Sequence, residues 1–306
     1  MNTLSEHQRW QRQVVGSLPR TNWASLTQGL RPWLCLDGAH SETLEDDVQA
    51  ATKRFDYHWI WRDTVREYGV PGYRQGPLLV ALDEPLCAHA VDHWLRRQAG
   101  LILLGPDDDD MLIRHLRRLH VLMASDGFPL GFNLHATRTL EEFCEGLPAN
   151  RLSELFGPIQ RFIWYAGDEQ TGEWLFADAP ANERLTVMTE APIALTMDDE
   201  AALDHASLAW FMRDCAREFR RRFPAYDHPD NEPMLWRHLT HFVNEATDQL
   251  ALTNERDVRH YMALRFQYPH ERFAKDATLR DILLQRQMDG KQRLFGAEAR
   301  LAAETA

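Results

Sequence analysis

The chain has 306 residues, about twice the length of an ordinary domain, so it can form two units that each bury a core. Its composition, 44% hydrophobic and 26% charged, is close to the globular average and excludes a disordered or fibrous protein. Because 46 acidic residues face 34 basic ones, the formal net charge of −12 argues against nonspecific binding to nucleic acid or to an anionic membrane.

The first fifteen residues are polar and lack the apolar core of a signal peptide. The longest apolar run, near Leu101–Leu104, is far shorter than the roughly 20 residues that cross a bilayer. The four cysteines are widely spaced and form no Cys-x-x-Cys pair, which is typical of reduced thiols in the cytosol. The sequence therefore predicts a cytoplasmic protein with no membrane partner.

From Trp33 onward, short apolar runs alternate with stretches of helical periodicity. We expect strands at Trp33–Leu36, Tyr57–Trp61, Leu78–Leu82, Leu101–Leu104 and Leu130–Leu134, and a closing hairpin of Phe162–Tyr165 with Trp174–Phe176. We expect helices at Ser41–Phe55, Pro85–Gln98, Asp107–Met123, Thr139–Cys144 and Pro148–Phe156. This alternation predicts an α/β (α+β) N-terminal lobe with a mixed sheet and flanking helices.

The hydrophobic pattern becomes purely helical after residue 196. Amphipathic helices are expected at residues 198–223, 233–250, 254–266 and 276–288, which predicts an all-helical C-terminal lobe. The segment before them contains Pro180 and Pro192 and little periodicity, so it is expected to connect the lobes. The predicted organisation is an N-terminal extension (1–22), an α/β domain (23–178), a linker (179–196) and a helical domain (197–301).

Familiar catalytic signatures are missing from the sequence: it has no phosphate-binding glycine loop, no Gly-x-Ser-x-Gly elbow and no catalytic cysteine motif. His89 with His93, and His238 with His241 and Glu245, have the one-turn spacing that can place metal ligands on one helix face. The His-Glu-x-x-His core is absent, which favours polar surface residues instead. We expect no catalytic residue, no metal and no cofactor.

Two charge runs have competing interpretations. Asp107–Asp110 stand at the start of a predicted helix, where acids cap free N–H groups and complement the helix dipole; a divalent cation site is the minor alternative. Arg220, Arg221 and Arg222 end a predicted helix and match its negative pole, yet three guanidinium groups could also grip the carboxylates of a partner. Arginine, rather than lysine, dominates the basic residues, as it does at protein interfaces.

Four stretches succeed one another in an order found in a known family. They are Trp33–Ala39; Gly76–Val80; His115–Leu119 followed by Asp126-Gly127; and Leu155–Ile159 before an aromatic strand. In this order they resemble the bacterial family catalogued as domain of unknown function 4123, the adaptor chaperones of type VI secretion effectors. The likeness covers about residues 30–178, and the tail with Leu252–Val258 is similar to the segment after the domain in longer members.

One stretch departs from the family's pattern. Members usually carry an Arg-containing aromatic strand that runs into Asp-Pro-Arg, whereas this chain has Phe132–Leu140, in which only Arg138 matches those polar positions. If the missing Arg and Asp form an ion pair in relatives, the loss of both residues destabilises the fold less than the loss of one, which would leave a buried charge without a partner.

The resemblance implies a noncatalytic adaptor that binds the N-terminal segment of an effector in the cytoplasm and promotes its loading onto a VgrG-type spike protein. The expected contact surface is the helical lobe together with its junction to the α/β lobe, with Arg220–Arg222 as the charged contacts. The alternatives are a metal-dependent hydrolase that uses Asp107–Asp110 or His238 and His241, and an immunity protein that binds a toxin.

Overall fold

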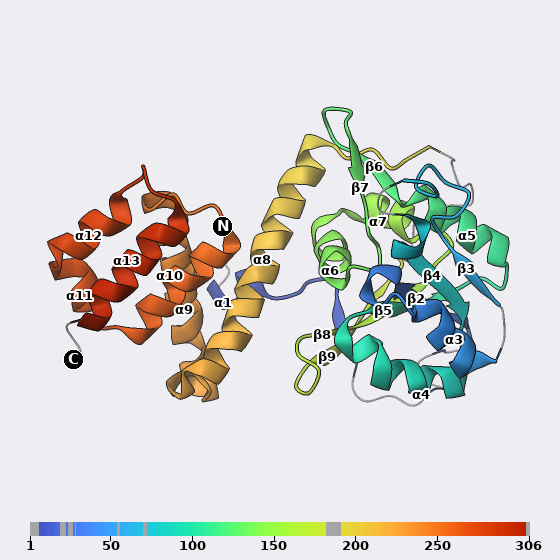
Figure 1. The fold of residues 1–306 in the computed structure, drawn as a ribbon, viewed down its shortest axis with the longest axis horizontal. Coiled ribbons are helices and arrows are strands. Elements are labelled where there is room, and N and C mark those ends of the chain that lie inside the picture. Colours follow the sequence, from blue (N-terminus) through green and yellow to red (C-terminus); the bar gives the residue numbers. More distant parts are fainter. Residues whose placement is uncertain are drawn as a thin grey trace. The chain divides into compact units, whose positions relative to one another are not determined.

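The computed structural model describes residues 6–18, 23, 27, 29–53, 56–69, 72–181 and 191–303. It divides into two compact units, which are distinguished in Figure 1 by the sheet in one and helices alone in the other. The sheet unit comprises Arg12–Ser207, and the helical unit comprises Met1–Gln11 together with Leu208–Ala306. The predicted fold class, an α+β lobe followed by an all-helical lobe, is confirmed.

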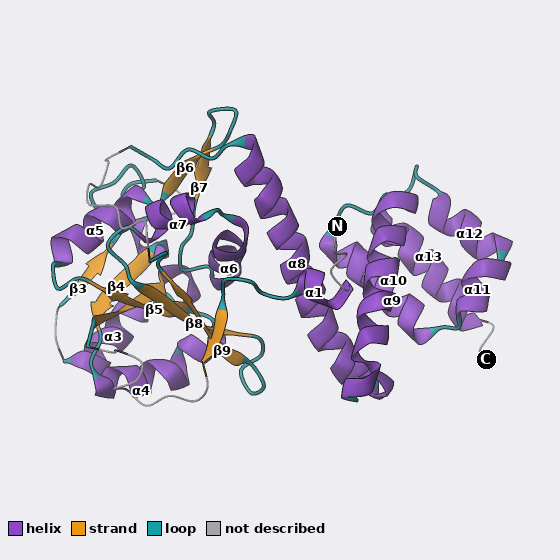
Figure 2. Ribbon diagram, turned by 180° about the vertical axis from the view of Figure 1, so that it is seen from behind, coloured by secondary structure: helices purple, strands orange, loops and turns teal. Residues whose placement is uncertain are grey.

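Seven strands form the main sheet in the order β1-β9-β8-β5-β2-β4-β3. They are β1 (Gly16–Leu18), β2 (Arg31–Asp37), β3 (Tyr57–Trp59), β4 (Pro77–Ala81), β5 (Gly100–Gly105), β8 (Arg161–Ala166) and β9 (Glu173–Asp178). Figure 2 shows the strands in orange with helices around them. All six pairings are antiparallel, in contrast to the mixed sheet predicted from the sequence. The reason is that β4 and β5, which helix α4 (Glu84–His93) joins, run in the same direction but have β2 between them.

Both faces of this sheet are covered. Neighbouring residues of a strand point to opposite faces, so Trp33 and Cys35 of β2 enter one hydrophobic cluster while Leu34 and Leu36 enter another. The first cluster includes residues of helices α5 (Asp109–Arg118), α6 (Thr137–Gly146) and α7 (Ala149–Phe156); the second includes residues of α3 (Leu44–Thr52) and α4. The continuous apolar runs of the central strands result from this double burial.

A small hairpin of β6 (Val121–Met123) and β7 (Pro129–Gly131) corrects one prediction. The helix expected over Asp107–Met123 ends at Arg118, and the chain is extended from Val121. Leucines continue at helical spacing past Arg118, so the sequence pattern resembles that of a longer helix. The hairpin forms because the Asp126-Gly127 turn reverses the chain, and Gly127 adopts a φ of +85° there.

The longest helix, α8 (Met197–Arg222), belongs to both units because the division falls between Ser207 and Leu208. Thr196 and Asp199 cap its start with reciprocal hydrogen bonds between backbone N–H groups and side-chain oxygens. The helical unit also contains α1 (Glu6–Trp10), α9 (Glu232–Asn244) with a π-helical turn (Glu245–Gln249), α10 (Glu255–Gln267), α11 (His270–Lys275), α12 (Ala277–Leu284) and α13 (Gly290–Ala303). The helix expected over 276–288 thus ends at Leu284, and Gly290 begins a further helix.

The residues that flank the predicted α/β domain 23–178 are divided between the two units. Residues 12–22 and 179–207 group with the sheet, and residues 1–11 group with the helices. Of the predicted linker 179–196, residues 182–190 lie outside the described residues. Beyond residue 200, the described part of the chain contains no strand. Within the described ranges, no helix has the length and apolar character needed to cross a bilayer.

Candidate partner-binding site

The three arginines predicted to contact a partner lie in the last turn of α8. Arg220 is half-buried and forms a salt bridge with Glu232 at the start of α9. Arg221 and Arg222 are exposed, and the guanidinium of Arg222 lies 5.4 Å from the centre of the Phe223 ring. Arg220 is therefore held by a carboxylate of its own unit, while Arg221 and Arg222 are presented at the surface.

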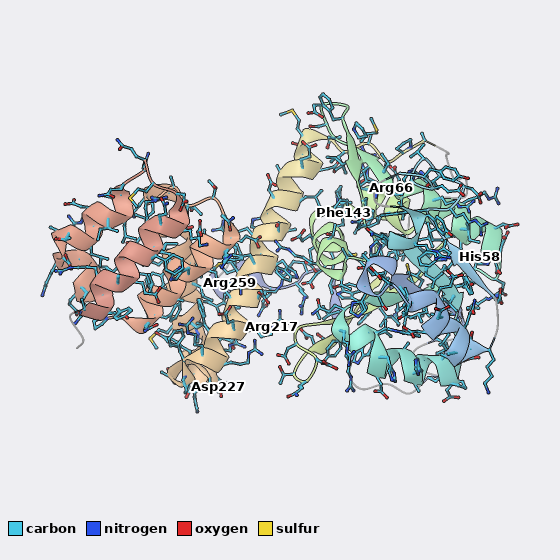
Figure 3. All side chains as sticks on the ribbon, in the orientation of Figure 1. His58, Arg66, Phe143, Arg217, Asp227 and Arg259 are labelled. Atoms are coloured by element: carbon cyan, nitrogen blue, oxygen red, sulfur yellow. The ribbon has the colours of Figure 1, made fainter. Side chains whose placement is uncertain are left out.

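Other arginines near this helix end are also neutralised within the helical unit. Arg259 of α10 contacts Asp214 at 2.7 Å and Glu218 at 2.6 Å, and Arg217 contacts Asp214 at 3.1 Å; Figure 3 labels both arginines. The two ion pairs of Arg259 connect α8 to α10, whereas Arg217 and Asp214 are neighbours on α8. Arg217 and Arg259 thus serve the packing of the unit, so an incoming carboxylate would have to displace an existing partner.

An aromatic cluster lies beneath this helix end. Phe266 of α10 is at its centre, with four ring centroids 4.9 to 5.5 Å away; they belong to Phe219, Phe223, Tyr226 and Phe242. The Tyr226 hydroxyl is hydrogen-bonded to His238 Nδ1 at 3.0 Å, and burial lowers the pKa of His238 below its usual value. His238 is therefore used inside the cluster.

The candidate metal ligands are not assembled. His238 lies in the aromatic cluster, His241 is exposed, and Glu245 is 2.7 Å from the guanidinium of Arg265. Among the residues that the structure describes, no three His, Cys, Asp or Glu side chains are grouped so that they could hold a metal ion.

The acidic run 107–110 caps a helix. Asp108 accepts a hydrogen bond from the backbone N–H of Met111 at 3.0 Å, which satisfies one free donor at the start of α5. Asp109 contacts Arg31 at 3.1 Å, and Arg31 also donates to the carbonyl oxygen of Asp107 at 2.8 Å. These contacts agree with the capping interpretation of the sequence.

The first histidine pair lines a cavity of about 530 Å³ in the sheet unit. The rings of His89 and His93 are stacked with their centroids 4.0 Å apart, and His93 Nδ1 donates to the carbonyl oxygen of His89 at 2.9 Å. Burial and the neighbouring His93 lower the pKa of His89. The predicted one-turn spacing brings the two imidazoles together, with His40 and Asp47 elsewhere in the lining.

Burial keeps the cysteine thiols protonated. It raises the pKa of Cys35 to about 12, that of Cys87 to about 11 and that of Cys215 to about 12, and it raises the pKa of Cys144 as well. A nucleophilic cysteine requires an accessible thiolate, so none of these four residues is prepared for covalent catalysis.

Two of the stretches that carry the resemblance meet at a buried histidine. His115 of α5 is fully buried, and its Nε2–H donates to the carbonyl oxygen of Leu155 at 2.9 Å. Gly157 has a φ of +52°, and a Cβ atom there would lie 2.4 Å from Cε1 of His115. Burial lowers the pKa of His115 to about 4. The Phe-Gly-Pro turn is therefore built around a neutral imidazole from the His-Leu-Arg-Arg stretch.

A second contact involves the stretch that departs from the family's pattern. Asp37, at the end of β2, lies 3.3 Å from Nε2 of the buried His135 and accepts a hydrogen bond from the N–H of Ala39 at 2.9 Å. Burial acts to raise the pKa of Asp37, but the hydrogen bond and charge of His135 and the Ala39 N–H outweigh it and lower that pKa. His135 thus supplies a partner for Asp37 from within Phe132–Leu140.

The sequence analysis did not predict that residues near the N-terminus pack into the helical unit. Trp10 is 1% exposed, its Nε1 donates to Thr240 at 3.0 Å, and Arg213 donates to its carbonyl oxygen at 2.9 Å. All three residues belong to the helical unit. A lone tryptophan in a polar stretch was the one available signal, because its partners are more than 200 positions away.

Residues 12–18 are held in the sheet unit by carboxylates. Arg12 donates to Glu141 at 2.8 Å and to Glu173 at 2.7 Å. Glu145 accepts hydrogen bonds from the three successive backbone N–H groups of residues 13–15, at 2.7, 3.1 and 2.7 Å. Beyond them, β1 adds an edge strand to β9. This mode of binding, an edge strand anchored by charged contacts, is the one by which sheets capture extended peptides.

A scan against protein-family models, a search of curated proteins and a search of solved structures each found no match to this chain.

Proposed function

We propose that the chain is an adaptor, a noncatalytic chaperone that binds a type VI secretion effector in the cytoplasm and promotes its loading onto a VgrG-type spike protein. The observation that carries the proposal is that the family-like stretches contact one another. Trp33–Ala39 and Gly76–Val80 form the neighbouring strands β2 and β4, with Leu34 opposite Val80. His115 joins the other two stretches. A shared framework of this kind supports membership of the adaptor family.

We assign effector recognition to the helical unit, because recognition has to differ between adaptors while the framework is common. Arg221 and Arg222 are the preferred charged contacts because both are exposed, whereas Arg220 is half-buried in its salt bridge with Glu232; Arg222 also donates to Gln267 at 3.4 Å. Their complement is an acidic stretch in the N-terminal segment of the effector. Exposed ion pairs contribute only about 0.2 to 1 kcal/mol each, so these contacts tune the affinity rather than create it.

The test is copurification of the full chain with the effector encoded beside it, followed by titration calorimetry. Reversal of both charges, Arg221→Glu with Arg222→Glu, is expected to weaken effector binding about tenfold, since it removes two attractions and adds repulsion. Arg96→Glu is the matched control, because Arg96 is an exposed arginine of the sheet unit. An effector that does not bind contradicts the proposed function, and one that binds the double variant unchanged contradicts the assigned surface.

The two alternatives give different outcomes in the same assay. A metal-dependent hydrolase would lose its function on chelation and on replacement of a histidine ligand. The adaptor should bind its effector equally well after chelation and with His241→Ala, which changes the exposed histidine of the pair. An immunity protein would inhibit the enzymatic activity of the toxin that it binds. An adaptor is instead expected to promote delivery of its effector, which is measured by secretion.

A further inference from the structure

A cavity of about 320 Å³ in the helical unit belongs to none of the contacts described so far. Tyr261, Phe273 and Leu283 are buried side chains in its lining, and Arg280 and Leu284 are exposed ones. The volume is at the lower end of the range for small-molecule sites. An apolar lining with a few convergent polar groups is the usual composition of such sites.

The main polar group of the cavity is the guanidinium of Arg265, whose side chain is 1% exposed. Its Nη1 donates to Glu245 at 2.9 Å and to the Tyr261 hydroxyl at 3.2 Å, and its Nη2 donates to His270 Nδ1 at 2.7 Å. These bonds use three of the five N–H groups of an arginine. Within the described residues, Nε has no hydrogen-bond partner. A buried N–H group without an acceptor costs free energy, so a ligand that supplies an acceptor to Nε is stabilised.

Aromatic rings hold the guanidinium in place. Its central carbon lies 4.6 Å from the ring centre of Phe242 and 4.5 Å from that of Phe273. Aromatic faces attract a cation but offer no acceptor to its N–H groups, which point outward in the plane of the guanidinium. A ligand therefore has to approach Arg265 through that plane, and a planar carboxylate suits this geometry.

The charges of the lining leave the cavity positive. The lining contains two arginines, Arg265 and Arg280, and one carboxylate, Glu245, which pairs with Arg265. The guanidinium of Arg280 also donates to the carbonyl oxygen of Ala274 at 2.8 Å. His270 contributes an acceptor, since its Nδ1 accepts the hydrogen bond that Arg265 donates. Glu245 itself lies in a π-helical turn, a local irregularity that is frequent at functional sites.

We propose that this cavity binds a small carboxylate with an apolar body. The carboxylate pairs with Arg265 and Arg280, and the body packs against Tyr261, Phe273 and Leu283. A cation is repelled by the two arginines, and a neutral apolar molecule leaves the Nε–H of Arg265 without an acceptor. The proposal goes beyond the adaptor function and does not depend on it.

The test uses 3-phenylpropionate as the probe and 3-phenylpropionamide as its uncharged counterpart, titrated into the full chain and followed by NMR. We expect the acid to bind with a Kd on the order of 1 mM, as the size of the ligand allows. The amide should bind at least tenfold more weakly, because it cannot neutralise the arginines. Equal affinities, or no binding of the acid, would overturn the proposal.

Three variants locate the binding. Leu284→Trp fills the mouth and should abolish acid binding, and Arg280→Ala should weaken it several-fold. Both change exposed side chains, so neither depends on refolding of the core. Glu245→Gln removes the competing charge but keeps an acceptor for Arg265, and should strengthen acid binding several-fold. Arg256→Ala, an exposed arginine of α10 outside the lining, is the control. Wild-type acid binding by the Leu284→Trp variant would contradict the assignment.

Discussion

At position 115 a histidine is kept neutral by its surroundings, and this makes stability depend on pH. Its pKa in the folded protein is lowered to about 4, so the unfolded chain takes up the proton first as the pH falls below the usual value of 6.5. The stability that this residue retains at neutral pH is therefore lost progressively between about pH 6.5 and pH 4. From this group alone, the free energy of unfolding should be about 2 kcal/mol lower at pH 5 than at pH 7.

Urea unfolding of the wild type and of His115→Gln at both pH values measures this effect. The variant should show a smaller decrease in stability between pH 7 and pH 5, by about 2 kcal/mol, whatever its stability at pH 7. His228→Gln is the control, because His228 is well exposed. Asp37 does not interfere: its lowered pKa confines the loss of its contribution to pH values below about 4. An unchanged pH dependence in the His115 variant would contradict the prediction.

Gly157 tests the same contact from the other side. Gly157→Ala has to adopt a φ of +52° and also places a Cβ atom within 2.4 Å of the His115 ring, whereas Gly127→Ala has only an unfavourable φ of +85° and open space around it. We expect a loss of about 1 kcal/mol for Gly127→Ala and about 3 kcal/mol or more for Gly157→Ala. Equal losses in chemical denaturation would mean that the imidazole does not restrict this turn.

At the scale of elements, the sequence predicted what local patterns determine. The central strands β2, β4 and β5 were recognisable because double burial makes them continuous apolar runs, and the β8–β9 hairpin because glycines mark its turn. The end of α5 and the strand β6 were wrong, since leucine spacing fits both structures over a few residues. The antiparallel order was not predictable. A strand–helix–strand succession such as β4–α4–β5 suggests neighbouring parallel strands, but here β2 lies between β4 and β5.

For the candidate site, too, only the features that depend on local sequence were predictable. The run Arg220–Arg222 was correctly placed at a helix end by its sequence alone. The salt bridge of Arg220 depends on Glu232, which lies beyond a turn, and the exposure of Arg221 and Arg222 depends on the packing of the helix end. The carboxylates around the N-terminal segment come from α6 and β9, about 130 to 160 positions away, so no spacing rule reports them.

The edge strand β1 should depend on Glu145. Glu145→Ala removes the acceptor of three backbone N–H groups, and hydrogen bonds to a charged group each contribute about 1.5 to 3 kcal/mol. Hydrogen exchange of residues 13–18 should become at least tenfold faster, with the central strands β2 and β5 unchanged. Glu142→Ala, on the same helix but paired with Arg138, is the control. Unaltered exchange at residues 13–18 would show that strand pairing alone holds the segment.

At the scale of the whole molecule, Trp10 should stabilise the helical unit selectively. Among the described residues, Trp10 belongs to the hydrophobic cluster of that unit and not to the two clusters of the sheet unit. Trp10→Ala is expected to cost the helical unit about 3 to 5 kcal/mol. Hydrogen exchange in α9 and α10 should accelerate accordingly, while that in β2 and β5 should not. Arg256→Ala, an exposed change on α10 of the same unit, should leave both unaffected. Faster exchange in the central strands would refute selective stabilisation.

The division of the chain also fixes an order of events on the ribosome. The sheet unit is one continuous segment inserted into the helical unit, which is made from residues 1–11 and the residues after 207. Trp10 is therefore synthesised about 200 residues before the helices that enclose it, which at 5 to 20 residues per second is a delay of roughly 10 to 40 s. During that interval the sheet unit can complete its fold. Closure of the helical unit around the indole is then a late step, which comes after synthesis of the last helices.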